Sequence, residues 1–191
     1  MSRLAPLSAA VAAATLLAVT IGGGAAVAKP IDRGTVHEEL DVVLTDFCGV
    51  AGLEVDLHVD VVFEYAVRSR GSDQLPYFSQ LATGTRTFTN PDNDRVVTEH
   101  FNGLEKDLRV TDNGDGTFTI LVLGTGNSTL TGTDGKAIAR NPGQTRWEIL
   151  IDNNGTPQDP TDDEFLADLG NVKESTGRTD DYCAAIVAEL T

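Results

Sequence analysis

Apolar and polar residues alternate almost without interruption along one long stretch of the chain, residues 53–67. One face of this stretch is apolar or aromatic throughout, whereas the other is mainly acidic and includes a histidine. A period of two over this length predicts a β-strand with one buried face, which needs partner strands on both sides. We expect the inward residues to be Leu53, Val55, Leu57, Val59, Val61 and Phe63, and the outward residues to be Glu54, Asp56, His58 and Asp60.

Turn signals divide the rest of the chain into further strands. Gaps of 20 to 22 residues separate polar clusters centred on Gly71, Asp92, Gly114, Asp134 and Asn154. Several of these clusters contain Asn-Gly or Asp-Gly pairs, which favour hairpin turns. The stretches between them are rich in β-branched and aromatic residues and predict strands. These strands are expected over residues 78–89, 95–110, 117–131 and 145–152, with a first strand over 36–47 and a last one over 164–172.

Glycines interrupt the predicted strands at Asn102-Gly103 and at Gly124–Gly126, where we expect a bulge or a sharp bend. Near the end of the chain, residues 184–190 are mostly apolar, and Thr179 or Asp180 is placed to cap a short helix there. The sequence therefore predicts an all-β fold: an antiparallel up-and-down barrel of seven or eight strands with a short C-terminal helix. A two-sheet β-sandwich is the alternative.

Residues 1–28 have the layout of a secretory signal peptide. A single cation, Arg3, precedes an apolar stretch over residues 11–21, and Ala26-Val27-Ala28 supplies small residues for cleavage before Lys29. The apolar stretch is too short to span a bilayer. We therefore expect residues 29–191 to be a single β-barrel domain that is released outside the cell.

Composition narrows the classes of partner. The 191 residues carry a formal net charge of −15, which repels phosphate backbones and anionic lipid head groups. We therefore expect neither a nucleic acid nor a membrane as partner. The only two cysteines, Cys48 and Cys183, both lie in the exported part, where oxidation is favoured. They are predicted to form a disulfide.

Motifs that would assign an enzymatic activity are incomplete. His37-Glu38-Glu39-Leu40-Asp41 begins like a zinc-protease helix, but Asp41 stands where the H-E-x-x-H motif needs a histidine, and the segment is strand-like. His37, His58 and His100 are scattered along the chain and are expected as exposed or hydrogen-bonded strand residues. No catalytic residue is assigned, and a non-catalytic protein is the favoured interpretation.

An acidic segment over residues 152–164 has a density of oxygen ligands that can hold Ca²⁺. It is not an EF-hand, because Pro157 stands where that loop needs glycine. A solvated acidic loop is the favoured interpretation, and a calcium site is the alternative. The expected metal ligands are Asp152, Asp159, Asp162 and Asp163.

Several short motifs carry a resemblance to other proteins. They are Phe47-Cys48-Gly49, Asn90-Pro91, Asp112-Asn113-Gly114-Asp115-Gly116-Thr117, Ile151-Asp152, Gly155-Thr156-Pro157, Asp159-Pro160, Asp162-Asp163-Glu164-Phe165 and Cys183. Together the chain resembles a group of uncharacterised secreted proteins common in actinobacteria. This resemblance implies secretion and assigns no activity. By fold-level analogy alone, the expected architecture is similar to lipocalin-like or allene-oxide-cyclase-like barrels.

These features favour a secreted, non-catalytic β-barrel protein whose interior binds a small apolar ligand. Phe63, Tyr65 and Trp147 are the candidate pocket residues. One alternative is an isomerase or hydrolase that works at a barrel mouth with carboxylates as acid and base. A further alternative is an extracellular interaction module.

Overall fold

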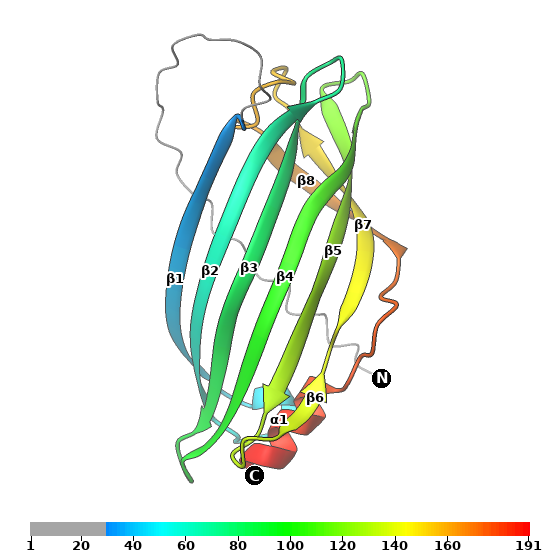
Figure 1. The fold of residues 1–191 in the computed structure, drawn as a ribbon. Helices are drawn as coiled ribbons and strands as arrows, with labels where there is room; N and C mark the ends of the chain where they lie inside the picture. The colour runs from blue at the N-terminus through cyan, green and yellow to red at the C-terminus, as the bar shows by residue number, and fades with distance from the viewer. Residues whose placement is uncertain (1–29) are drawn as a thin grey trace.

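The computed structural model describes residues 30–191 as one strongly curved antiparallel sheet with a short helix at one end (Figure 1). The strands are β1 (Asp32–Leu44), β2 (Val55–Arg70), β3 (Leu75–Asn90), β4 (Arg95–Asp112), β5 (Thr117–Thr131), β6 (Ala137–Arg140), β7 (Gly143–Asp152) and β8 (Glu164–Lys173). A 3₁₀ turn, η1 (Phe47–Gly49), follows β1, and the helix α1 (Tyr182–Leu190) ends the chain. The predicted signal peptide, residues 1–28, lies outside the described residues. None of the helices described is long and apolar enough to cross a membrane.

The strands follow one another through the sheet in the order β1-β2-β3-β4-β5-β7-β8, and the short β6 pairs with β5 beside β7. This confirms the all-β, up-and-down fold with a C-terminal helix. All strands described belong to one sheet, so the sandwich alternative is not adopted. The end strands β1 and β8 do not pair with each other within residues 30–191, which leaves the sheet open.

The alternation in β2 places its two faces as predicted. Leu53, Val55 and Val61 are buried, whereas Glu54 and Asp56 are exposed. The face of the sheet that carries these buried residues also contacts α1, and we call it the inner face; the opposite side is the outer face.

Apolar side chains on the inner face form two separate clusters, one toward each end of the sheet. The first packs the sheet against α1, and the second fills the other end between β4, β5 and β7. The first cluster contains Leu53, Val55, Phe88, Val97, Leu130, Ala139, Ile186 and Leu190, and the second contains Val110, Phe118, Ile120 and Val122. The middle of the inner face lies between these clusters and is more polar.

The predicted disulfide is confirmed. Cys48 in η1 and Cys183 in α1 are bonded, with their Cα atoms 5.5 Å apart. The bond therefore fixes the helix to the segment that joins β1 and β2, at the end of the sheet where the first cluster lies (Figure 1).

The helix cap lies one residue later than the sequence predicts. Asp181 caps α1, because its Oδ1 accepts a hydrogen bond from the Ala184 N–H at 2.9 Å. The carboxylate of Asp180 instead accepts the Arg140 N–H at 2.9 Å and pairs with Arg178. The contact with β6 is remote in sequence, so local capping preference cannot reveal it.

Of the bulge or sharp bend predicted at the mid-strand glycines, the bulge is not found there. Gly103 and Gly126 pair directly without a change of register, and the β4–β5 register shifts instead between Asp107 and Arg109. A Cβ atom on Gly126 would lie only 2.5 Å from the Asn102 carbonyl oxygen. These glycines therefore permit a close approach of the two strands where the sheet curves.

Candidate functional site

The middle of the inner face carries a connected chain of polar side chains. Arg86 on β3 and Glu99 on β4 stand directly opposite each other, with Arg86 Nη1 2.8 Å from Glu99 Oε2. Ser128 on β5 donates a hydrogen bond to the second oxygen of Glu99. The Tyr182 hydroxyl of α1 donates to Ser128 Oγ at 2.8 Å. Arg86, Glu99, Ser128 and Tyr182 thus link three strands to the helix, and we call them the inner polar chain.

The Arg86–Glu99 ion pair of the inner polar chain is held in place by the burial of Glu99. Glu99 is only 6% exposed, so its carboxylate depends on Arg86 and Ser128 to replace the water it has lost. The Arg86 guanidinium is less buried and lies over the Phe101 ring, 4.4 Å from its centroid. Arg86 is therefore held from two sides, and its partly exposed guanidinium carries further N–H donors besides the one that binds Glu99.

A cleft of about 430 Å³ lies next to the inner polar chain. This volume falls within the range of small-molecule sites, and the cleft is shallow and widely open to solvent. Gly103, Gly124, Gly126 and Gly143 line it without side chains, so backbone forms much of its floor. The side chains that border this floor and bear on binding are Arg86, Glu99, Phe101, Ser128, Asn141 and Gln144.

The pocket residues predicted from the sequence lie elsewhere along the inner face. The Tyr65 hydroxyl donates to Asp32 Oδ2 at 3.2 Å, and Trp147 packs against the second apolar cluster, with its ring close to Gly124. Phe63 is half-buried on β2. None of the three lines the cleft, and the residues that do line it had no sequence signal other than the mid-strand glycines.

Asp107 is a buried acid between the cleft and the second cluster. It is 7% exposed, and burial raises its pKa to about 6. The charge of Glu105 raises this pKa further, whereas the hydrogen bond from the Phe78 N–H and the charge of Arg70 lower it. Asp107 does not line the cleft, and its Oδ2 accepts the Phe78 N–H at 2.7 Å, so its position serves the β3–β4 contact.

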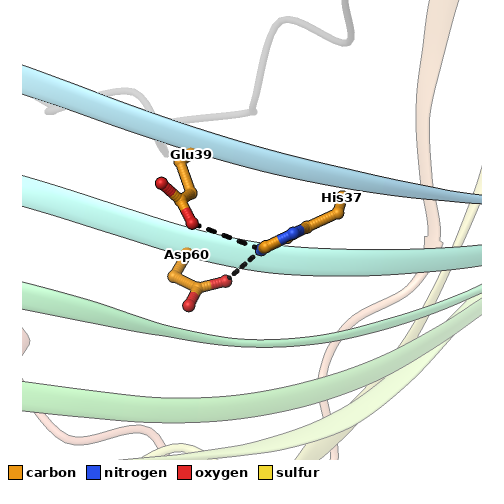
Figure 2. Close-up of side chains that lie close together, drawn as sticks. All are labelled: His37, Glu39 and Asp60. Carbon is orange, nitrogen blue, oxygen red and sulfur yellow. Dashed lines mark hydrogen bonds and ion pairs between the residues drawn. The ribbon is translucent and has the colours of Figure 1, made fainter.

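A second polar group lies on the outer face, where β1 and β2 pair (Figure 2). His37 Nε2 is 2.7 Å from Asp60 Oδ1 and 3.8 Å from Glu39 Oε1. In the next row, His58 Nδ1 is 2.8 Å from Asp41 Oδ1. The sequence does not predict this group, because the zinc-protease motif at His37 is incomplete and the three histidines are scattered along the chain. In a strand, alternate residues share a face, so His37 and Glu39 lie on the same side of β1. The pairing of Glu39 opposite Asp60 then brings the third residue to them.

The acidic segment from the end of β7 to β8 holds the four predicted ligands, but within residues 30–191 no three of its carboxylates have oxygen atoms that all lie within 4.8 Å of one another. Burial raises the pKa of Asp163 to about 6, and the charges of Asp162, Asp159 and Asp152 add to this increase. Asp163 Oδ1 is buried and accepts no hydrogen bond from any residue of 30–191, whereas the carboxylate of Asp162 accepts one from the Thr156 hydroxyl. Calcium binding by this loop stays a prediction.

Comparisons of the chain with protein-family models, with curated proteins and with solved structures find no match. The resemblance to secreted actinobacterial proteins and to lipocalin-like barrels stays a prediction for the same reason. The chemistry of the sites themselves is therefore the basis for a functional proposal.

Proposed function

We propose that this chain is a secreted, non-catalytic binding protein that holds a small molecule in the cleft on its inner face. The observation that carries the proposal is the cleft itself, with its backbone floor beside a fixed Arg86–Glu99 pair. Such a surface suits a ligand with a flat, apolar body that rests on the glycines and Phe101 and with an acceptor group that reaches Arg86. The apparent signal peptide and the Cys48–Cys183 disulfide support export.

The composition of the cleft favours binding over catalysis. Glu99 is already engaged by Arg86 and Ser128, so it is poorly placed to exchange a proton with a substrate. Among the described residues that line the cleft there is no histidine, cysteine or second carboxylate. Asp107, the inner-face carboxyl with the strongly raised pKa, lies outside the lining. The isomerase or hydrolase alternative therefore lacks an acid–base pair in this cleft.

The exposed sheet edges favour an interaction module as the second candidate. Leu40 on β1 is 54% exposed, and Phe165 and Val172 on β8 are 60% and 59% exposed. Both strands lack a pairing partner on one side within residues 30–191. Apolar side chains beside free backbone N–H and C=O groups are features that a further strand can recognise.

Native mass spectrometry of the protein purified from its host's medium tests the binding proposal. We expect a small molecule retained at one copy per chain, and we expect Arg86→Gln to lose it. The matched control is Arg109→Gln, which removes another cross-strand arginine, paired with Glu148 at 3.2 Å but remote from the cleft. This control should retain the full ligand load.

Arg86→Gln leaves the buried Glu99 without its counter-charge and can therefore misfold. A second variant distinguishes misfolding from loss of the binding site. Arg86→Gln/Glu99→Gln keeps a hydrogen bond between the two amides and removes both charges. This double variant should fold and still lose the ligand. Absence of any retained molecule in the parent protein, or retention by both Arg86 variants at the level of the parent, would contradict the proposed function.

A further inference from the structure

The outer-face group of His37, Glu39 and Asp60 combines one imidazole with two carboxylates at the edge of the sheet. Figure 2 shows both carboxylates directed toward the ring of His37. One donor atom from each of the three residues lies within 4.8 Å of the other two. We propose that these residues bind a divalent transition-metal ion of the zinc class, with His37 Nε2, Glu39 Oε1 and Asp60 Oδ1 as ligands.

The donor distances fit a tetrahedral ion after a small adjustment. Zinc bonds of about 2.0–2.2 Å to nitrogen and oxygen place neighbouring donors roughly 3.3–3.5 Å apart in a tetrahedral site. The observed separations from His37 Nε2, 2.7 Å and 3.8 Å, lie on either side of that value. The three side chains are 48–64% exposed, which leaves them room for a small shift of their donor atoms. Three protein ligands leave the fourth position for water.

The electrostatics of the strand pair favour a cation at this point. Glu39 and Asp60 are directly opposite each other in the β1–β2 register, and like charges in that position repel. Asp41, the next outward residue on β1, adds to the negative potential. A neutral imidazole supplies a lone pair but no positive charge. A divalent ion bound by His37 would use that lone pair and neutralise both carboxylates.

The mixture of one imidazole and two carboxylates determines which metal ion is expected. Calcium and magnesium prefer oxygen donors alone, whereas an imidazole among the ligands selects zinc, nickel or copper. His58 lies in the next row, with its Nδ1 2.8 Å from Asp41 Oδ1, and it is not one of the three residues whose donor atoms all lie within 4.8 Å of one another. We therefore place His58 outside the ligand set.

Isothermal titration of the purified secreted protein with Zn²⁺ tests this site. We expect one strongly bound ion per chain, and at least tenfold weaker binding for His37→Gln and for Asp60→Asn. The matched control is His100→Gln. His100 is an exposed histidine on the same outer face, two strands away from Asp60: Asp60 on β2 pairs with Thr85 on β3, which pairs with His100 on β4. This control should leave the affinity within twofold of the parent protein.

Further variants separate this site from the other candidate ligands of the chain. His58→Gln and the acidic-loop variant Asp162→Asn/Asp163→Asn should each keep the zinc affinity within threefold. Circular dichroism checks that every variant is folded. The proposal is overturned if the parent takes up no zinc, if His37→Gln binds as well as the parent, or if His58→Gln or the loop variant loses as much affinity as His37→Gln.

Discussion

At the scale of single residues, burial has its clearest effect at Asp107. The pKa of this carboxyl is about 6 in the folded protein because of burial, against an ordinary value near 3.8. The folded state therefore keeps a proton that the unfolded chain releases between about pH 4 and pH 6. Stability falls as the pH rises through this window, and the cost persists above it.

Asp107→Asn removes this cost and leaves an amide oxygen to accept the Phe78 N–H. We expect its free energy of unfolding to exceed that of the parent at pH 7.5, by up to about 3 kcal/mol, with a much smaller difference at pH 4. Urea denaturation at both pH values measures this. An equal change at the two pH values would show that Asp107 is ionised in the folded state and that its pKa is not raised.

Asp115→Asn is the matched control, because its pKa shift has the opposite sign. Hydrogen bonds from Thr117 lower the pKa of this exposed carboxylate, so it favours folding above its ordinary pKa. The substitution should slightly lower stability at pH 7.5 and have less effect at pH 3. Gain of stability in Asp115→Asn at pH 7.5 would contradict the assignment.

Sequence alone predicts which residues share a face, but not which residues of different strands meet. Cys48 and Cys183 could be paired because no third cysteine competes with them. The Arg86–Glu99 pair and the His37–Asp60 contact depend on the exact register between neighbouring strands. That register is set by turn geometry and by the packing of both strands, which no single stretch of sequence contains.

At the scale of elements, β2 offers a direct test of the face assignment. Leu57 packs against the first apolar cluster, whereas Asp56 is exposed on the outer face. Leu57→Asp should lower the free energy of unfolding by about 2–4 kcal/mol, because a charge replaces an apolar contact. Asp56→Asn should change it by less than about 0.5 kcal/mol. Thermal melts compare the two, and equal effects would contradict the assignment of the two faces.

The elements that sequence misplaces are those fixed by distant contacts. Hairpin signals locate the long strands well, since each turn chemistry acts locally. The four residues of β6 are too few to show an alternation of apolar and polar positions. They pair with the part of β5 that extends past β7. The cap of α1 shifts to Asp181 because Asp180 binds the Arg140 backbone.

At the scale of the whole molecule, the order of the strands is predictable and the closure of the sheet is not. An up-and-down order follows from successive hairpins. Closure requires that strand number, tilt and stagger agree around the barrel. The β7–β8 register shifts at three points, near Trp147, Ile149 and Ile151, and no sequence pattern signals these shifts. In the part of the chain that the structure describes, the edge strands β1 and β8 do not pair with each other.

The disulfide constrains the whole chain, because it closes a loop of 135 residues. In the chain-entropy model a loop of this length is worth about 5 kcal/mol, and measured effects are often smaller. Cys48→Ser/Cys183→Ser should therefore unfold at a distinctly lower urea concentration than the parent. Intact-mass measurement with a thiol reagent provides the control, and two reactive thiols in the native protein would contradict the bond.

The net charge of −15 determines how calcium binding by the acidic loop has to be tested. Any salt screens repulsion in so acidic a chain, so a specific site must stabilise the fold beyond ionic strength. Ca²⁺ at ten times its dissociation constant adds about 1.4 kcal/mol if Asp152, Asp159, Asp162 and Asp163 bind it. We expect a higher melting midpoint in CaCl₂ than in EDTA at matched ionic strength. An unchanged midpoint, or a shift reproduced in full by Asp162→Asn/Asp163→Asn, would leave only a solvated acidic loop.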